Sequence, residues 1–267
     1  MIPFAKHFKY SAVAIIALSI CAKGAPAPQH IDVKQLSKKV DDVVVPLPNE
    51  VFGALNKLGP VNWREYVRSD KGSNFTERPR IALLLGTVIA DGFIAVQAED
   101  APAVKDIGQR VQALARGIGV ERSITQHAKA IIEAADKRNW DSVRQELDRT
   151  QNSVQTAMNE VHDEKLSQLV SLGGWLRGTE VLTAVVTKRY SVEGAELLHQ
   201  PDLLAYFQTR LEGMPEHKIP LLQDIHGALL QVRPLIDVPA AKISAESVKK
   251  INDITARLDA AIVTKAP

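Results

Sequence analysis

The chain has little cysteine, few aromatic residues and no excess of charge of either sign. Cys21 is the single cysteine among 267 residues, and aromatic residues make up 5% of the sequence. The 33 basic and 31 acidic residues nearly cancel, so there is no basic excess of the kind that holds a nucleic acid. Runs that alternate apolar and polar residues, as half-buried strands do, are also missing. These absences argue against a disulfide-stapled scaffold, a nucleic-acid-binding protein and an all-β fold.

The N-terminal segment has the order of a secretory signal. Lys6 and Lys9 precede an apolar stretch over residues 11–22, which is too short to span a bilayer comfortably. Ala22 and Gly24 follow with the small-x-small spacing that a signal peptidase accepts. We therefore expect residues 1–24 to be a signal peptide and the mature protein to be exported, either periplasmic or secreted. A retained N-terminal anchor is the alternative.

Removal of this leader would change both the charge and the cysteine content. Residues 1–24 hold three lysines and no acidic residue, so the mature chain has 30 basic and 31 acidic residues and a net charge of −1. Loss of Cys21 excludes disulfides and thiol catalysis in the mature protein. A lipoprotein anchored through Cys21 is the alternative, although Ile20 stands where such signals need a small residue. Residues 25–30, rich in proline and alanine, are expected to form a flexible tether.

Motifs for nucleophilic, phosphate and metal chemistry are equally scarce. The chain contains no Gly-x-Ser-x-Gly, no phosphate loop and no Gly-x-Gly-x-x-Gly that follows a strand. Glu196 and His199 form the single Glu-x-x-His motif, whereas carboxylate-bridged di-iron bundles use two. We therefore expect no metal site and no cofactor, with Glu196 and His199 as the residues that a metal would use if one were bound.

What the sequence does contain is helical periodicity along most of its length. A first short stripe is formed by Val33, Leu36, Val40 and Val43. Turn residues then separate expected helices at about 49–58, 79–98, 100–117, 121–137, 141–160, 166–189, 191–199, 202–212 and 217–236. This pattern predicts an all-α, multi-helix, bundle-like domain over residues 31–237, followed by a linker and a C-terminal amphipathic helix over residues 238–267.

Two of the expected helices, 79–98 and 166–189, are apolar around most of their circumference. Helices of this kind are usually buried, so we expect the domain to be built around this pair. Both contain glycine, which costs a helix about 1 kcal/mol relative to alanine and indicates close packing between helices. The pair Gly173-Gly174 is expected to interrupt the second helix. Charged residues within both helices make a transmembrane interpretation unfavourable, so no transmembrane helix is expected in the mature chain.

Those charged residues are Asp91 in the first helix and Arg177 and Glu180 in the second. Charges in a helical core need partners, so we expect Asp91 and Arg177 to be buried and to form an ion pair that fixes the register of the two helices. The alternative is a polar pocket between the helices, in which these three residues would bind a ligand or a substrate.

The C-terminal helix has the most regular seam. Val248, Ile251, Leu258 and Ile262 recur at the alternating three- and four-residue spacing of a packed helix. We expect this helix to dock on its own domain, and a protein partner bound through the same four residues is the alternative. Together these observations favour an exported, non-enzymatic binding or structural protein of the cell envelope. The rival hypothesis is a helical enzyme or ligand-binding protein whose site is Asp91, Arg177 and Glu180.

Overall fold

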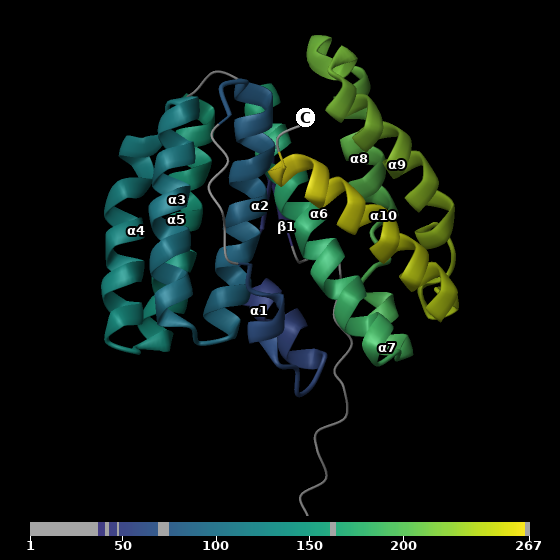
Figure 1. Ribbon diagram of the computed structural model, residues 1–267, viewed down its shortest axis with the longest axis horizontal. Helices are drawn as coiled ribbons and strands as arrows, with labels where there is room; N and C mark the ends of the chain where they lie inside the picture. Colours follow the sequence, from purple (N-terminus) through teal and green to yellow (C-terminus); the bar gives the residue numbers. More distant parts are fainter. Residues whose placement is uncertain (1–36, 41–42, 47, 69–74, 161–163, 265–267) are drawn as a thin grey trace, which may run out of the picture.

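The computed structural model describes residues 37–40, 43–46, 48–68, 75–160 and 164–264. Within these residues the chain is almost entirely helical, which confirms the all-α, bundle-like fold class (Figure 1). The expected signal peptide, the tether and Cys21 lie outside the described residues.

The elements follow one another along the chain with short connections. They are β1 (Ser37–Val40), β2 (Val43–Pro46), α1 (Pro48–Lys57), the 3₁₀ helix η2 (Trp63–Tyr66), α2 (Arg78–Gln97), α3 (Ala101–Ile118), α4 (Glu121–Asp136), α5 (Trp140–Glu160), α6 (Glu164–Lys188), α7 (Val192–Glu196), α8 (Pro201–Glu212), η3 (Pro215–Lys218), α9 (Pro220–Ile236), η4 (Ala240–Lys242) and α10 (Ala245–Val263).

The two apolar helices, α2 and α6, form the centre of the fold and pack most extensively against each other. Their backbones touch at glycines. A Cβ on Gly86 would lie 1.8 Å from the carbonyl oxygen of Val170, and a Cβ on Gly173 would lie 2.0 Å from that of Leu83. Only glycine fits at these two positions. The sequence-based expectation that Gly173 and Gly174 interrupt this helix is wrong, because α6 is continuous through both residues. Gly173 instead allows the backbones of α2 and α6 to come close together.

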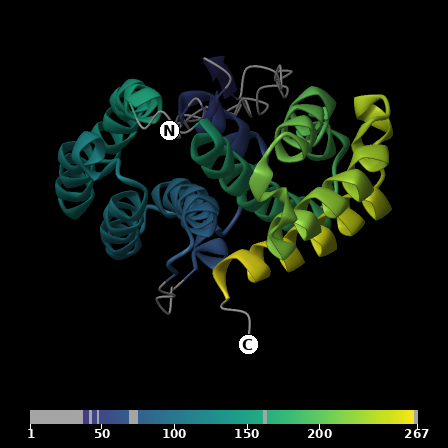
Figure 2. The same ribbon diagram turned by 90° about the horizontal axis from the view of Figure 1, so that it is seen from above.

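Helices α3 to α5 and helices α8 to α10 lie on two flanks of this central pair (Figures 1 and 2). On one flank, α3, α4 and α5 follow α2 in sequence, and each packs against the next. On the other flank, α8 and α10 pack against α6, with α10 crossing over it, and α9 packs against α8 and α10. The four seam residues of α10, Val248, Ile251, Leu258 and Ile262, are buried in this core.

Local signals explain several helix ends. The Asp100 side chain accepts a hydrogen bond from the backbone N–H of Ala103 and caps α3. Gly119 ends α3 with a left-handed backbone at φ 92°. The Ser244 hydroxyl caps α10 by accepting from the backbone N–H of Ser247.

The stripe Val33, Leu36, Val40 and Val43 was interpreted as helical, and this prediction is wrong for Val40 and Val43, the two members that the structure describes. Residues 37–40 and 43–46 form two antiparallel strands in which Val40 pairs with Val43 and Ser37 pairs with Pro46. The run Val43-Val44-Val45 is β-branched, which favours extended backbone over helix. β2 lies against α5 and α6.

Among the described helices, α2 alone has the length and hydropathy needed to cross a membrane. Its most apolar window is 72% buried inside the protein, and Asp91 lies within it. The apolar character of α2 is therefore explained by its central place in the core.

Candidate functional site

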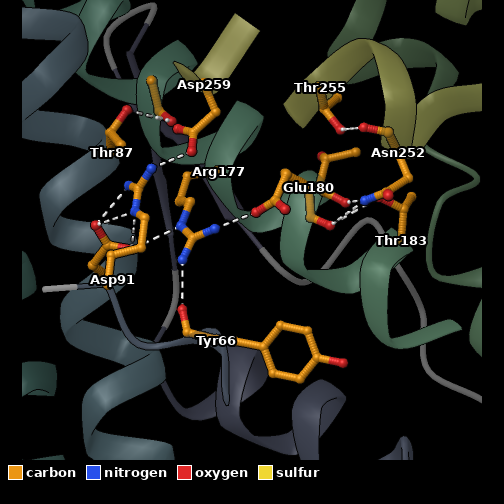
Figure 3. Close-up of polar contacts among 12 residues, drawn as sticks. Tyr66, Thr87, Asp91, Arg177, Glu180, Thr183, Asn252, Thr255 and Asp259 are labelled. Carbon is orange, nitrogen blue, oxygen red and sulfur yellow. Dashed lines mark hydrogen bonds and ion pairs between the residues drawn. The ribbon is translucent and has the colours of Figure 1, made fainter. Parts of the chain in front are cut away.

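The Asp91 and Arg177 side chains meet at the centre of the α2–α6 interface (Figure 3). The Arg177 Nε donates to Asp91 Oδ1 over 2.7 Å. The two side chains are 5% and 2% exposed, so neither charge has appreciable contact with water. The expectation of a buried ion pair between these residues is confirmed.

Asp91 has a second cationic partner that the sequence did not reveal. Arg68, which follows η2, donates from Nε to both carboxylate oxygens of Asp91, at 3.2 and 3.1 Å, and from Nη2 to Oδ2 at 2.6 Å. A guanidinium held at two points on a carboxylate has a fixed orientation as well as a fixed distance. Asp91 therefore ties the segment after η2 to the α2–α6 core.

Arg177 likewise serves more than one partner. Its Nη1 pairs with the carboxylate of Glu180 one helical turn further along α6. Its Nη2 donates to the backbone carbonyl of Tyr66, in η2, over 2.6 Å. Asp91, Arg177 and Glu180 are thus brought together, as either sequence-based hypothesis for them requires.

Helix α10 adds a third carboxylate to the cluster, Asp259, which pairs with Arg68 Nη1 and is 5% exposed. A second polar link lies nearby on the same helix. The Asn252 amide donates to the carbonyl of Glu180 at 3.0 Å and to the hydroxyl of Thr183 at 3.1 Å. Helix α10 is therefore held to α6 by polar contacts as well as by its apolar seam.

The buried network contains three carboxylates and two guanidinium groups, so it carries one excess negative charge when all five are ionised. The pKa of Asp259 is displaced by its surroundings in this network. Burial raises the pKa of its carboxyl from 3.8 to about 6, against the opposing effect of Arg68. Its Oδ1 is also buried without a hydrogen-bond partner. A proton on Asp259 would remove the excess charge.

The arrangement leaves little of the network available to a ligand. Asp91, Arg177 and Glu180 are each bound to one another or to neighbouring protein groups. None of them lines either of the two hollows found nearby. The network connects η2, α2, α6 and α10, and its observed contacts are those of a structural cross-link.

A cleft of about 390 Å³ opens beside this network. One wall is the segment 57–66, which joins α1 to η2, and the other is the segment 185–191 at the end of α6. Tyr66 links the cleft to the network. It lines the cleft, and its backbone carbonyl accepts a hydrogen bond from Arg177. The buried network therefore fixes the position of one cleft wall. The volume lies within the range of small-molecule sites.

The cleft is lined by three cations and one carboxylate. Glu65 is paired with Lys188 at 2.8 Å, and the Lys188 ammonium also lies 5.0 Å from the centre of the Tyr66 ring. Arg189 Nη2 donates to the backbone carbonyl of Leu58 over 2.6 Å. No carboxylate among the described residues pairs with Arg189, so the cleft has a net positive charge.

Glycine and apolar residues give this cleft its shape. Gly59 has φ +75°, a conformation that side-chain-bearing residues rarely adopt, and a Cβ there would lie 3.0 Å from Arg189 Nη2. Leu58, Val61 and Val185 contribute apolar surface to the lining. The cleft thus combines an apolar body with a guanidinium.

The Glu196–His199 motif lies across the end of α7, so the two residues do not share one helical face. The His199 Nδ1 instead lies 3.0 Å from the backbone carbonyl oxygen of Ile236. Across the residues that the structure describes, no three His, Cys, Asp or Glu side chains gather closely enough to hold a metal ion.

Comparison of the chain with protein-family models, with curated proteins and with solved structures found no match. The case for function therefore depends on the chemistry of the chain itself.

Proposed function

We propose that this protein is an exported binding protein that holds a small organic anion with an apolar body in the cleft between residues 57–66 and 185–191. The observation that carries the proposal is the Arg189 guanidinium, which lines the cleft and is paired with no carboxylate among the described residues. Export is supported by the basic, apolar and small-residue order of residues 6–24.

The chemistry of the lining defines the ligand class. A guanidinium with donors left over recognises carboxylate, sulfonate or phosphate groups, because it offers several N–H bonds in one plane. The apolar side chains of Leu58, Val61 and Val185 favour a ligand that also has an apolar part. Lys188 adds positive charge but is already paired with Glu65, so Arg189 is expected to make the direct contact.

The buried network supports this function by holding the cleft in place. Tyr66 is fixed through its carbonyl to Arg177, and Arg68 is fixed to Asp91 immediately after η2. A wall that is rigid before the ligand arrives reduces the entropy lost on binding. Asp91, Arg177 and Glu180 are accordingly proposed to position the site and not to touch the ligand.

Two fluorescent probes of similar shape test the proposal. Anilinonaphthalene sulfonate carries an anionic group, and N-phenyl-1-naphthylamine has the same aromatic body without it. We expect the anionic probe to bind the folded protein more tightly, with an affinity that falls as salt is added. Arg189→Gln should weaken that probe by about 10- to 100-fold, the equivalent of one charge-assisted hydrogen bond, and should leave the neutral probe unaffected.

Arg122→Gln is the matched control, because Arg122 is an exposed arginine on α4, away from the cleft. Glutamine at position 189 keeps a donor for the Leu58 carbonyl, so the cleft wall should persist; circular dichroism checks the fold. Equal binding of the two probes, or equal effects of the two substitutions, would refute the proposal.

A further inference from the structure

A second polar cluster lies between α4 and α5, on the flank formed by α3, α4 and α5. The His127 Nδ1 is 2.7 Å from Glu146 Oε1, and its Nε2 is 2.7 Å from Ser153 Oγ. One imidazole thus bridges a carboxylate and a serine hydroxyl. The two residues that it bridges both belong to α5, whereas His127 belongs to α4.

The partners of His127 define its tautomer. An ionised carboxylate only accepts hydrogen bonds, so the ring proton of the neutral imidazole lies on Nδ1 and points at Glu146. Nε2 is then an acceptor, and the Ser153 hydroxyl donates to it. The hydrogen bond from His127 holds the pKa of the Glu146 carboxyl below its ordinary value, which keeps that group ionised.

Ser153 differs from the other hydroxyl residues nearby. Thr125 and Thr150 both donate to the backbone carbonyl four residues earlier in their own helices, at 2.7 and 2.6 Å. Ser171 in α6 does the same at 3.1 Å. This is the usual arrangement of such residues inside a helix. The Ser153 hydroxyl is instead directed at a histidine on another helix.

The order serine, histidine, carboxylate is that of an activated nucleophile: the base lies within reach of the hydroxyl proton and a third group orients the base. The cluster is also accessible. Ser153 is half-buried, and the His127 and Glu146 side chains are 22% and 15% exposed. Each of the three residues therefore retains some contact with solvent.

We propose that Ser153 is a nucleophile that takes the acyl group of small activated esters, with His127 as its general base and Glu146 as a positioning residue. Ser153 Oγ forms a bond to the ester carbonyl carbon, and its proton passes to His127 Nε2. The bond to the leaving alcohol breaks, and the alcohol departs with that proton. Water then hydrolyses the acyl-serine by the same relay and releases the carboxylic acid.

The surroundings limit the substrate to esters with good leaving groups. Ser153 lies inside α5, so its own backbone N–H is committed to the helix and does not stabilise an oxyanion. Arg149, one helical turn earlier on the same helix, donates from Nη1 to Glu146 Oε2 at 3.2 Å. The other N–H groups of the Arg149 guanidinium are the donors in this part of α5 that could stabilise the negative charge developing on the carbonyl oxygen.

A fluorophosphonate probe tests the proposal on the intact protein. Attack by Ser153 Oγ forms an O–P bond and expels fluoride, while His127 takes the proton. Peptide mass spectrometry should locate the adduct on Ser153, at a rate at least 100-fold above that of Ser171, which serves as the control serine. His127→Gln should slow labelling about 100-fold or more, the usual contribution of a general base.

A cysteine variant provides a second measurement that does not need an oxyanion site. An imidazole beside a thiol favours the thiolate, so Ser153→Cys should react with iodoacetamide at pH 6.5 at least 10-fold faster than Ser171→Cys. Adding His127→Gln should abolish the difference, and Cys21 is distinguished by peptide mapping. The proposal would be overturned if Ser153 were labelled no faster than Ser171. It would also be overturned if His127→Gln changed neither the labelling rate of Ser153 nor the alkylation rate of Ser153→Cys.

Discussion

Arg177 and Asp91 are 86 positions apart in the sequence, yet Nε of one lies 2.7 Å from Oδ1 of the other, and both side chains are buried between α2 and α6. Asp91→Leu or Arg177→Met alone should destabilise the protein by about 3–5 kcal/mol, because each removes an ionic partner from a charge that stays buried. The double variant should lose clearly less than the sum of the two, as chemical denaturation will show.

The double replacement is nevertheless expected to cost something, because Arg68 and Glu180 would each lose a partner. This is the reason to measure all four corners of the cycle. Strict additivity of the two single losses would mean that Asp91 and Arg177 do not interact.

Asp259 should make the stability of the protein depend on pH. Its folded-state pKa of about 6 lies above the ordinary 3.8, so the folded state binds a proton that the unfolded state releases. The stabilisation is fully present below pH 3.8 and is lost as the pH rises through 6. Between pH 7 and pH 5 the wild-type protein should gain about 1 kcal/mol relative to Asp259→Asn, which does not titrate.

Thermal or denaturant melts of both proteins at several pH values will measure this difference. The contributions of the other titrating groups are common to both proteins and cancel in the comparison. Parallel pH profiles for the wild type and Asp259→Asn would rule out a raised pKa at this position.

The glycines at the α2–α6 crossing should be intolerant of any side chain. Gly86→Ala and Gly173→Ala each place a methyl group within 2.0 Å of a backbone carbonyl oxygen, which no rotamer change can relieve. We expect losses above the roughly 1–3 kcal/mol typical of overpacking. Gly227→Ala is the control: it lies inside α9 with nothing within 4 Å, and should gain up to about 1 kcal/mol from helix propensity.

Melting temperatures of the three variants will rank these effects. A Gly86→Ala variant that melted at the wild-type temperature would contradict the close contact between the backbones of α2 and α6.

The N-terminal segment makes a prediction that mass spectrometry can check directly. We expect protein recovered from its native envelope to begin within a few residues of position 25 and to contain no cysteine, because cleavage after Gly24 removes Cys21. A mass that includes Met1, or one that includes a diacylated Cys21, would instead establish an anchored protein.

Helix ends and the central pair were predictable because their signals are local. Asp100, Gly119 and Ser244 act within one helical turn of themselves, and a helix that is apolar all round has to be buried. The Asp91–Arg177 pair was predictable for the same reason, since each charge lies in the middle of such a helix. The strands at 37–40 and 43–46 were missed because the three- and four-residue spacing of Val33, Leu36, Val40 and Val43 was given more weight than the β-branching of the valines.

Arg68 and Asp259 could not be predicted, because neither lies in an unusual sequence context. Their role depends on how α10 crosses α6, which is set by tertiary packing. The His127 cluster did leave a signal. Helices α4 and α5 form an antiparallel hairpin around residues 137–139, so residues near 150 face His127, with Glu146 and Ser153 one turn to either side. Pairing each residue of α4 with the residue of α5 at the same distance from that turn would have placed His127, Glu146 and Ser153 together.

The order in which the chain is synthesised has a consequence for the buried network. Arg68 and Asp91 emerge early, Arg177 and Glu180 much later, and Asp259 with α10 last of all. Until α10 is made, one face of α6 lacks its cover, and Arg68 lacks one of its two carboxylates. The flank of α3, α4 and α5 relies on contacts between neighbours and can form during translation. The face of α6 that α10 covers stays without that cover until residues 245–263 have been made, so the central pair is expected to reach its final packing later than the flank of α3, α4 and α5.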